Sequence, residues 1–128
     1  LIKDSSVKVR CGVACCAYGV SELMHDDSEE VRVTLARQGL CLDYLVHDKS
    51  KAVRVAVAKM GYGFEYLIDD PEPAVRVEVA ARGYGLDILI NDPHGLVRSA
   101  AKQYRKQGKP EREHIPPKVN KEETGTIA

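Results

Sequence analysis

The sequence repeats itself every 22 residues, without an insertion or a deletion, along most of its length. The units span residues 1–22, 23–44, 45–66, 67–88 and 89–106. Leu recurs at the first position of the unit, Asp at the fourth, Val at the ninth, Arg at the tenth and Ala at the fourteenth, where Lys102 breaks the column. A unit this short cannot bury its own apolar face, so neighbouring units must stack.

Each unit has signals for one medium helix and one very short one. Asp at the fourth position is a good N-cap, and Pro71 and Pro93 directly after it suit the first helical position. A helix of about eleven residues is then expected to end near the glycines at Gly39, Gly61 and Gly83. The segment before the next Asp has room for one or two turns, α or 3₁₀.

The Arg at the tenth position falls in the middle of the face that a helical wheel assigns to the core. An unpaired guanidinium there would be very costly, and the Asp column is the acidic column that matches it in number. We therefore expect a structural ladder in which each Arg bonds an Asp of its own unit, a neighbouring unit, or both. The other interpretation is an Arg row displayed for phosphate or carboxylate ligands. The ladder residues are Asp4, Asp26, Asp48, Asp70, Asp92, Arg10, Arg32, Arg54, Arg76 and Arg98.

The motif Leu-x-x-Asp-x-x-x-x-Val-Arg-x-x-Val-Ala, as in residues 67–80, resembles the HEAT-type helical repeat. The 22-residue length is most similar to the leucine-rich repeat variant branch of that group. This resemblance implies an all-α fold, a right-handed α-solenoid of five HEAT-like units over residues 1–106. Residues 107–128 would form a non-repetitive C-terminal tail. Such arrays mostly serve as interaction scaffolds with varied partners.

The two ends of the array differ. In the last unit Ser99, Lys102 and Arg105 replace apolar or small residues, as a solvent-facing terminal unit requires. The first unit keeps apolar residues on its open side, so we expect either upstream sequence or pairing with another copy. Self-association through this uncapped unit or through the tail is therefore one expectation.

The charges balance: 19 basic and 19 acidic residues give a formal net charge of zero. A general nucleic-acid or membrane-surface binder normally carries a basic excess. No stretch approaches the roughly 20 apolar residues of a membrane helix, and no signal peptide is evident. We expect no membrane association. No nucleophile-elbow, zincin, P-loop or dinucleotide-binding pattern is present, so we expect no enzyme, no catalytic residue and no cofactor.

The cysteines and histidines do not form a recognisable metal site. Cys11 and Cys41 replace small or apolar residues and are expected to be buried, whereas Cys15 and Cys16 are expected to be exposed. Reduced thiols of this kind indicate a cytoplasmic protein. A metal or iron–sulfur site is the sharper alternative, but Cys16 points about 100° away from Cys15 on a helix. The histidines that precede consecutive Asp positions, His25 and His47, are expected to be solvated loop residues.

The remaining candidate is a binding surface. An exposed stripe of the medium helices is expected to contact a protein or peptide partner, and Ala56 lies on this stripe. The tyrosines in the loops either contact the same partner or pack on the core. The partner-binding candidates are Arg37, Gln38, Lys59, Met60, Arg82, Tyr62 and Tyr84. Tyr44 and Tyr66 are expected to cover the core edge with their hydroxyls in water. Nucleic-acid backbone binding by the mildly basic line of Arg37, Lys59 and Arg82 is the alternative, together with a structural or self-assembling module.

Overall fold

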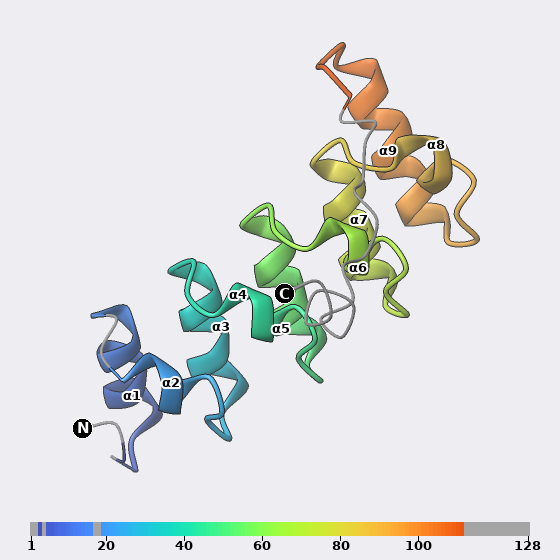
Figure 1. Ribbon diagram of the computed structural model, residues 1–128. Coiled ribbons are helices and arrows are strands. Elements are labelled where there is room, and N and C mark those ends of the chain that lie inside the picture. The colour runs from blue at the N-terminus through green and yellow to red at the C-terminus, as the bar shows by residue number, and fades with distance from the viewer. Residues whose placement is uncertain (1–2, 4, 17–18, 112–128) are drawn as a thin grey trace, which may run out of the picture.

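The computed structural model describes residues 3, 5–16 and 19–111 of the 128-residue chain. These residues form nine helices and no strands (Figure 1), which confirms the all-α class for this part of the chain. The long helices are α1 (Val7–Cys15), α3 (Glu29–Arg37), α5 (Lys51–Lys59), α7 (Pro73–Ala81) and α9 (Gly95–Lys106). The short helices are α2 (Val20–Leu23), α4 (Leu42–Leu45), α6 (Phe64–Leu67) and α8 (Leu86–Leu89).

In the described part of the chain each helix contacts only helices of its own or the next unit. Each long helix packs against the next long helix, and each short helix packs against the long helices before and after it. The result is an elongated row of long helices with the short ones along one side (Figure 1). Contacts of this kind fit a repeat-like packing, in which the stability of each unit depends on the units beside it.

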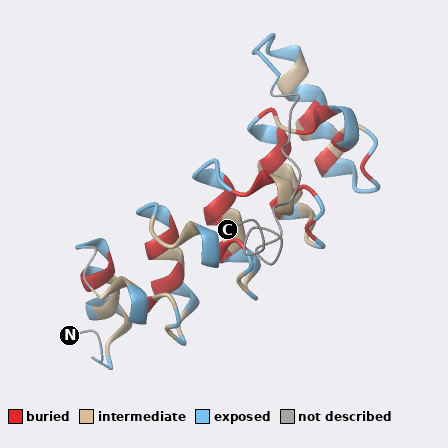
Figure 2. Cartoon of the chain, viewed as in Figure 1, coloured by how far each residue is buried: buried red, intermediate tan, exposed pale blue. Residues whose placement is uncertain are grey.

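The repeated apolar positions form the core. The Leu that ends each short helix is at most 1% exposed, and so is the Val in the first turn of α3, α5, α7 and α9. Figure 2 shows buried segments on each long helix of the row. Burying one such side chain stabilises the fold by roughly 2 kcal/mol. Val9 of α1 differs and is 36% exposed, because no described helix covers that side of α1.

The long helices begin two residues later than the sequence indicated, so the Asp is not the N-cap. The N-caps are Ser6, Ser28, Ser50, Glu72 and His94. The carboxylate of Asp70 instead accepts the backbone amide of Glu72 at 2.9 Å, and the preceding and following units do the same. Pro71 and Pro93 therefore lie in the turn before the helix. Four of the helices have nine residues rather than eleven for this reason.

The expected glycines end the long helices. Gly83 has φ +82°, and its amide donates to Ala80 while the next amide, of Tyr84, donates to Val79. This is the Schellman arrangement, which needs a left-handed residue after the helix. Gly39 and Gly61 end α3 and α5 in the same way. A Cβ on Gly83 would also collide with the ring of Tyr104 from α9, so a larger residue here would have to displace that ring.

The short helices begin at a second left-handed residue, and here one unit departs from the pattern. Gly19, Gly63 and Gly85 occupy this position in three units, whereas Cys41 holds it in the other with φ 56°. Cys41 is half-buried rather than buried, as is Cys11, so the expectation of full burial was wrong for both. A left-handed conformation costs a side-chain-bearing residue about 1–2 kcal/mol.

We expect Cys41→Gly to raise the free energy of unfolding by about 1 kcal/mol, because glycine adopts this conformation without strain. Urea denaturation followed by circular dichroism measures the change. Gly63→Ala is the matched control at the same position of the next unit, where a Cβ would strike Val46. It should destabilise the chain, and an unchanged or lower stability of Cys41→Gly would contradict the strain.

Candidate functional site

Two opposite edges of the row carry the residues singled out above. The Asp edge consists of the loops that precede the long helices, residues 24–28, 46–50, 68–72 and 90–94. The glycine edge consists of the loops that follow them, residues 38–41, 60–63 and 82–85. Figure 1 shows these two sets of loops on opposite sides of the long helices. Backbone N–H groups of the helices face the Asp edge and carbonyls face the glycine edge, which favours acidic and basic residues there, respectively.

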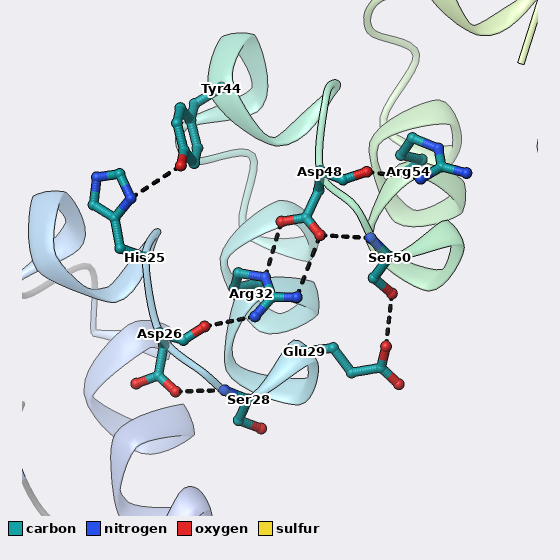
Figure 3. A network of polar contacts seen from close by, with 9 residues as sticks. All are labelled: His25, Asp26, Ser28, Glu29, Arg32, Tyr44, Asp48, Ser50 and Arg54. Atoms are coloured by element: carbon teal, nitrogen blue, oxygen red, sulfur yellow. Dashed lines mark hydrogen bonds and ion pairs between the residues drawn. The ribbon is translucent and has the colours of Figure 1, made fainter.

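Each paired Arg of the ladder binds the Asp of the following unit. Nε of Arg32 lies 2.8 Å from Oδ2 of Asp48, and its Nη2 lies 3.3 Å from Oδ1 (Figure 3). The same two bonds join Arg54 to Asp70, at 2.7 and 3.2 Å. Equivalent pairs are Arg10–Asp26 and Arg76–Asp92. A planar guanidinium and a carboxylate bound through two parallel bonds fix one relative orientation of the two units.

The third guanidinium nitrogen binds the Arg to its own unit. Nη1 of Arg32 donates to the backbone carbonyl of Asp26 at 2.5 Å, and Arg54 and Arg76 make the same bond. One side chain therefore joins the turn before its own helix to the turn before the next. The paired Asp side chains are 5–9% exposed and the paired Arg side chains 6–15%. Solvent therefore screens these charges little.

The electrostatic consequence is visible at Asp92. Burial alone would raise the pKa of its carboxyl. Burial is the largest single influence, but the hydrogen bond from Arg76, the amide of His94 and the charges of both residues together outweigh it, and the pKa of Asp92 lies below its ordinary value. The native state therefore favours the ionised carboxylate. This is the protonation state that the guanidinium requires.

Two equivalent grooves open along the Asp edge. The larger, of about 670 Å³, lies between the loops at residues 24–28 and 46–50, and the smaller, of about 400 Å³, lies one unit further along. Apart from Asp43 and Leu67, every residue that lines one groove lies 22 residues from one that lines the other. A ladder pair lines each groove, Arg32–Asp48 in the larger and Arg54–Asp70 in the smaller.

An imidazole and a phenol from opposite ends of the same unit form a wall of each groove, a pairing that the sequence did not predict. The Tyr44 hydroxyl lies 3.0 Å from Nδ1 of His25, and the two rings meet edge to face at 4.9 Å (Figure 3). His47 and Tyr66 repeat the edge-to-face contact at 4.7 Å. Tyr44 is 46% exposed, so its hydroxyl, which was expected to lie in water, contacts the imidazole at the surface. The 19-residue separation within each pair was the available signal, since it recurs in adjacent units.

The predicted partner-binding residues lie at the glycine edge and do not line these grooves. Arg37, Gln38, Lys59, Met60, Arg82 and Tyr62 are all exposed. Tyr84 is half-buried, and its ring packs on Phe64 with centroids 4.1 Å apart. Ala56 is buried although the wheel placed it on the exposed stripe. The structure thus brings most of the predicted set to one edge, whereas the two equivalent grooves lie at the other.

The thiols and histidines do not converge. Within residues 3, 5–16 and 19–111, no group of three or more His, Cys, Asp or Glu side chains is placed to hold a metal ion. Cys15 and Cys16 are exposed, as predicted. Burial, and then the charge of Asp43, raise the pKa of the Cys41 thiol. That thiol therefore stays protonated near neutral pH, which makes it a poor nucleophile.

None of the helices in the described part of the chain is long and apolar enough to cross a bilayer. No family model, no curated protein and no solved structure matches this chain. Function must therefore be argued from the chain's own geometry.

Replacing Arg54 with Leu should destabilise the chain by about 3–5 kcal/mol, because it leaves Asp70 buried without its cation. Urea unfolding gives the magnitude. Arg37→Leu at the exposed end of α3 is the matched control and should change stability by about 0.5 kcal/mol or less. Equal effects of the two substitutions would contradict a structural role for the ladder.

The lowered pKa of Asp92 makes stability depend on pH with a definite sign. Because the folded-state pKa lies below the unfolded value of about 3.9, the stabilisation is complete above that pH and is lost as pH falls through the folded-state pKa. Asp92→Asn should therefore lose less stability than the parent between neutral and acid pH. Urea midpoints across this pH range measure the loss of stability, with Asp43→Asn at an exposed position as the control. An identical acid dependence in Asp92→Asn and the parent would contradict the assignment.

Proposed function

We propose that the chain is a non-catalytic scaffold that binds an extended segment of a protein or peptide along the Asp edge. The observation that carries the proposal is the repetition of one groove, lined from equivalent positions of the unit, in consecutive units. The proposed frame is the right-handed α-solenoid of five HEAT-like units expected from the sequence. The ladder supports this frame because the same bidentate contact recurs between successive units.

The spacing of the grooves suits an extended chain. Adjacent helices in such an array are about 10 Å apart. An extended peptide in the polyproline II conformation advances about 3.1 Å per residue with three residues per turn, so every third side chain would meet a groove. The edge-to-face walls, His25–Tyr44 and His47–Tyr66, offer apolar ring surface together with hydrogen-bonding groups. Tyrosine in this setting is a common anchor for protein partners.

The charge of the grooves favours a basic segment. Each ladder pair is neutral as a unit, which leaves the exposed groups to set the local potential. Among the lining residues, Asp27, Asp43 and Asp69 are exposed carboxylates, whereas Lys49 is the exposed amine. We therefore expect Lys or Arg in the bound segment, between the side chains that meet the rings.

The nucleic-acid alternative applies to the opposite edge. Arg37, Lys59 and Arg82 are exposed there in three successive units. Each also lies at or next to the end of a long helix, where a cation is favoured by the helix dipole, so the line has a structural reason to exist. Binding to mixed-sequence DNA at low salt, with a steep loss of affinity as salt rises, would support this alternative.

Selection from a random peptide display library on the full chain tests the proposal, followed by calorimetry with the peptide selected. Tyr44→Ala should weaken that peptide about tenfold, as expected for loss of a tyrosine anchor. Tyr62→Ala is the matched control: Tyr62 is 39% exposed at the glycine edge, and Tyr44 is 46% exposed. Its affinity should stay within about twofold of the parent.

Two results would contradict the proposal. If Tyr62→Ala loses the peptide and Tyr44→Ala keeps it, the binding surface is the glycine edge. If selection yields no peptide that binds the chain above a scrambled control, the scaffold function at the Asp edge is wrong. Circular dichroism of both variants establishes that the comparison is between folded chains.

A further inference from the structure

The ladder ends on an Arg whose carboxylate partner is missing from the described residues. Nη1 of Arg98 donates to the Asp92 carbonyl at 2.6 Å, as in the earlier units, so the guanidinium is anchored to its own unit in the same way. In those units Nε and Nη2 bind the Asp that lies 16 residues ahead. The residue 16 positions after Arg98 is His114, which lies outside the described residues. Among the residues that the structure describes, no carboxylate takes the place of that Asp.

The surface around Arg98 is a groove lined only by neutral and cationic residues. It measures about 560 Å³ on the outer face of α9 and is lined by Gly95, Arg98, Ser99, Lys102, Gln103 and Lys106. Arg98, Lys102 and Lys106 are spaced four residues apart, which places them on one side of the helix. Like charges at this spacing destabilise a helix. Lys106 lies in the last turn of α9, where the helix dipole favours a cation, and the groove as a whole concentrates positive charge.

Solvation of a terminal unit does not by itself account for this composition. Alternating acidic and basic residues would keep the outer face of α9 in water equally well. At the positions of Ser99 and Lys102, α3, α5 and α7 hold Val and Ala and α1 holds Cys and Ala, and in each case the next long helix packs against them. Here both positions are polar, and the lining holds three cations and no carboxylate. The uncovered face is complementary to an acidic partner.

We propose that the outer face of α9 binds an acidic peptide segment of another protein, whose Asp carboxylate takes the bidentate position on Arg98. Lys102 and Lys106 then face further acidic side chains of the same segment. A carboxylate is favoured over a phosphate because the four preceding Arg residues hold a carboxylate on the same two nitrogens. This site is separate from the grooves of the Asp edge and goes beyond the scaffold function proposed there.

The chain's own ladder loops supply a probe. A fluorescein-labelled peptide with the sequence of residues 65–74 contains Asp70, which fills the equivalent position on Arg54. Fluorescence anisotropy with the full chain measures its affinity. We expect the peptide to bind, and its Asp70→Asn version to bind about tenfold more weakly, because a charge-assisted bidentate contact is lost.

Variants of the chain separate geometry from charge. Arg98→Lys keeps the positive charge but removes the two parallel N–H donors of the guanidinium, and we expect about a tenfold loss of affinity for the peptide. Lys59→Gln, at the exposed end of α5, removes a cation elsewhere and should leave the affinity unchanged. Tyr44→Ala should also leave it unchanged, so failure of this site and failure of the Asp-edge grooves can be told apart. Urea unfolding shows that Arg98→Lys remains folded.

Three outcomes would overturn the proposal. Equal affinity of the parent and Arg98→Lys would mean that positive charge alone holds the peptide. Tighter binding of a single-stranded DNA oligonucleotide than of the peptide at the same salt would assign the face to nucleic acid. A mass that doubles with concentration in light scattering, and that returns to the monomer in Arg98→Gln, would show that a second copy of this chain fills the face.

Discussion

The bidentate contact between an Arg and the Asp of the next unit is the interaction on which the rest of the structure depends. The apolar side chains of a 22-residue unit hold the units together, but contacts between Leu, Val and Ala allow small shifts in register. A planar guanidinium with fixed donor directions does not allow such shifts. Because Arg54 also binds the Asp48 carbonyl, it fixes the turn before its own helix and the turn before the next in one geometry.

The grooves of the Asp edge follow from this repeated geometry. Each turn is held at the same place relative to its neighbour, so His25 meets Tyr44 just as His47 meets Tyr66. The inner charges are neutralised in pairs, and the exposed ones, such as Asp27 and Lys49, differ from unit to unit. A row of similar grooves whose exposed charges differ is suited to binding one extended partner at several points along its sequence. The same constraint leaves Arg98 oriented at the end of the row.

The repeat predicted most of the local fold because residues 22 positions apart must have equivalent places in the structure. The core columns, the glycines that end the long helices and the matching of Arg with Asp all follow from it. The N-cap was misplaced because an Asp with several free lone pairs can cap a helix, close a turn or bind an Arg, and sequence alone does not rank these uses. The Asp70 carboxylate accepts the Glu72 amide in the turn and binds Arg54. Glu72 is therefore the N-cap, and α7 begins at Pro73.

The candidate site was harder to predict for a different physical reason. A groove between units depends on how far one turn stands from the next, and this distance is set by tertiary packing rather than by any residue pattern. The exposed stripe ending in Arg37 and Lys59 could be found because exposure follows helical periodicity. The contact between His25 and Tyr44 joins the two ends of one unit, 19 residues apart, and only the recurrence of that spacing pointed to it.

A double-mutant cycle between Arg54 and Asp70 tests the central claim most directly. Unfolding free energies of the parent, Arg54→Met, Asp70→Asn and the double variant give the coupling between two residues that belong to different units. The ladder predicts a coupling of about 1–3 kcal/mol, so the double variant should be more stable than the sum of the single losses implies. Additive losses, with a coupling near zero, would show that the units are held by apolar packing alone and would contradict the account.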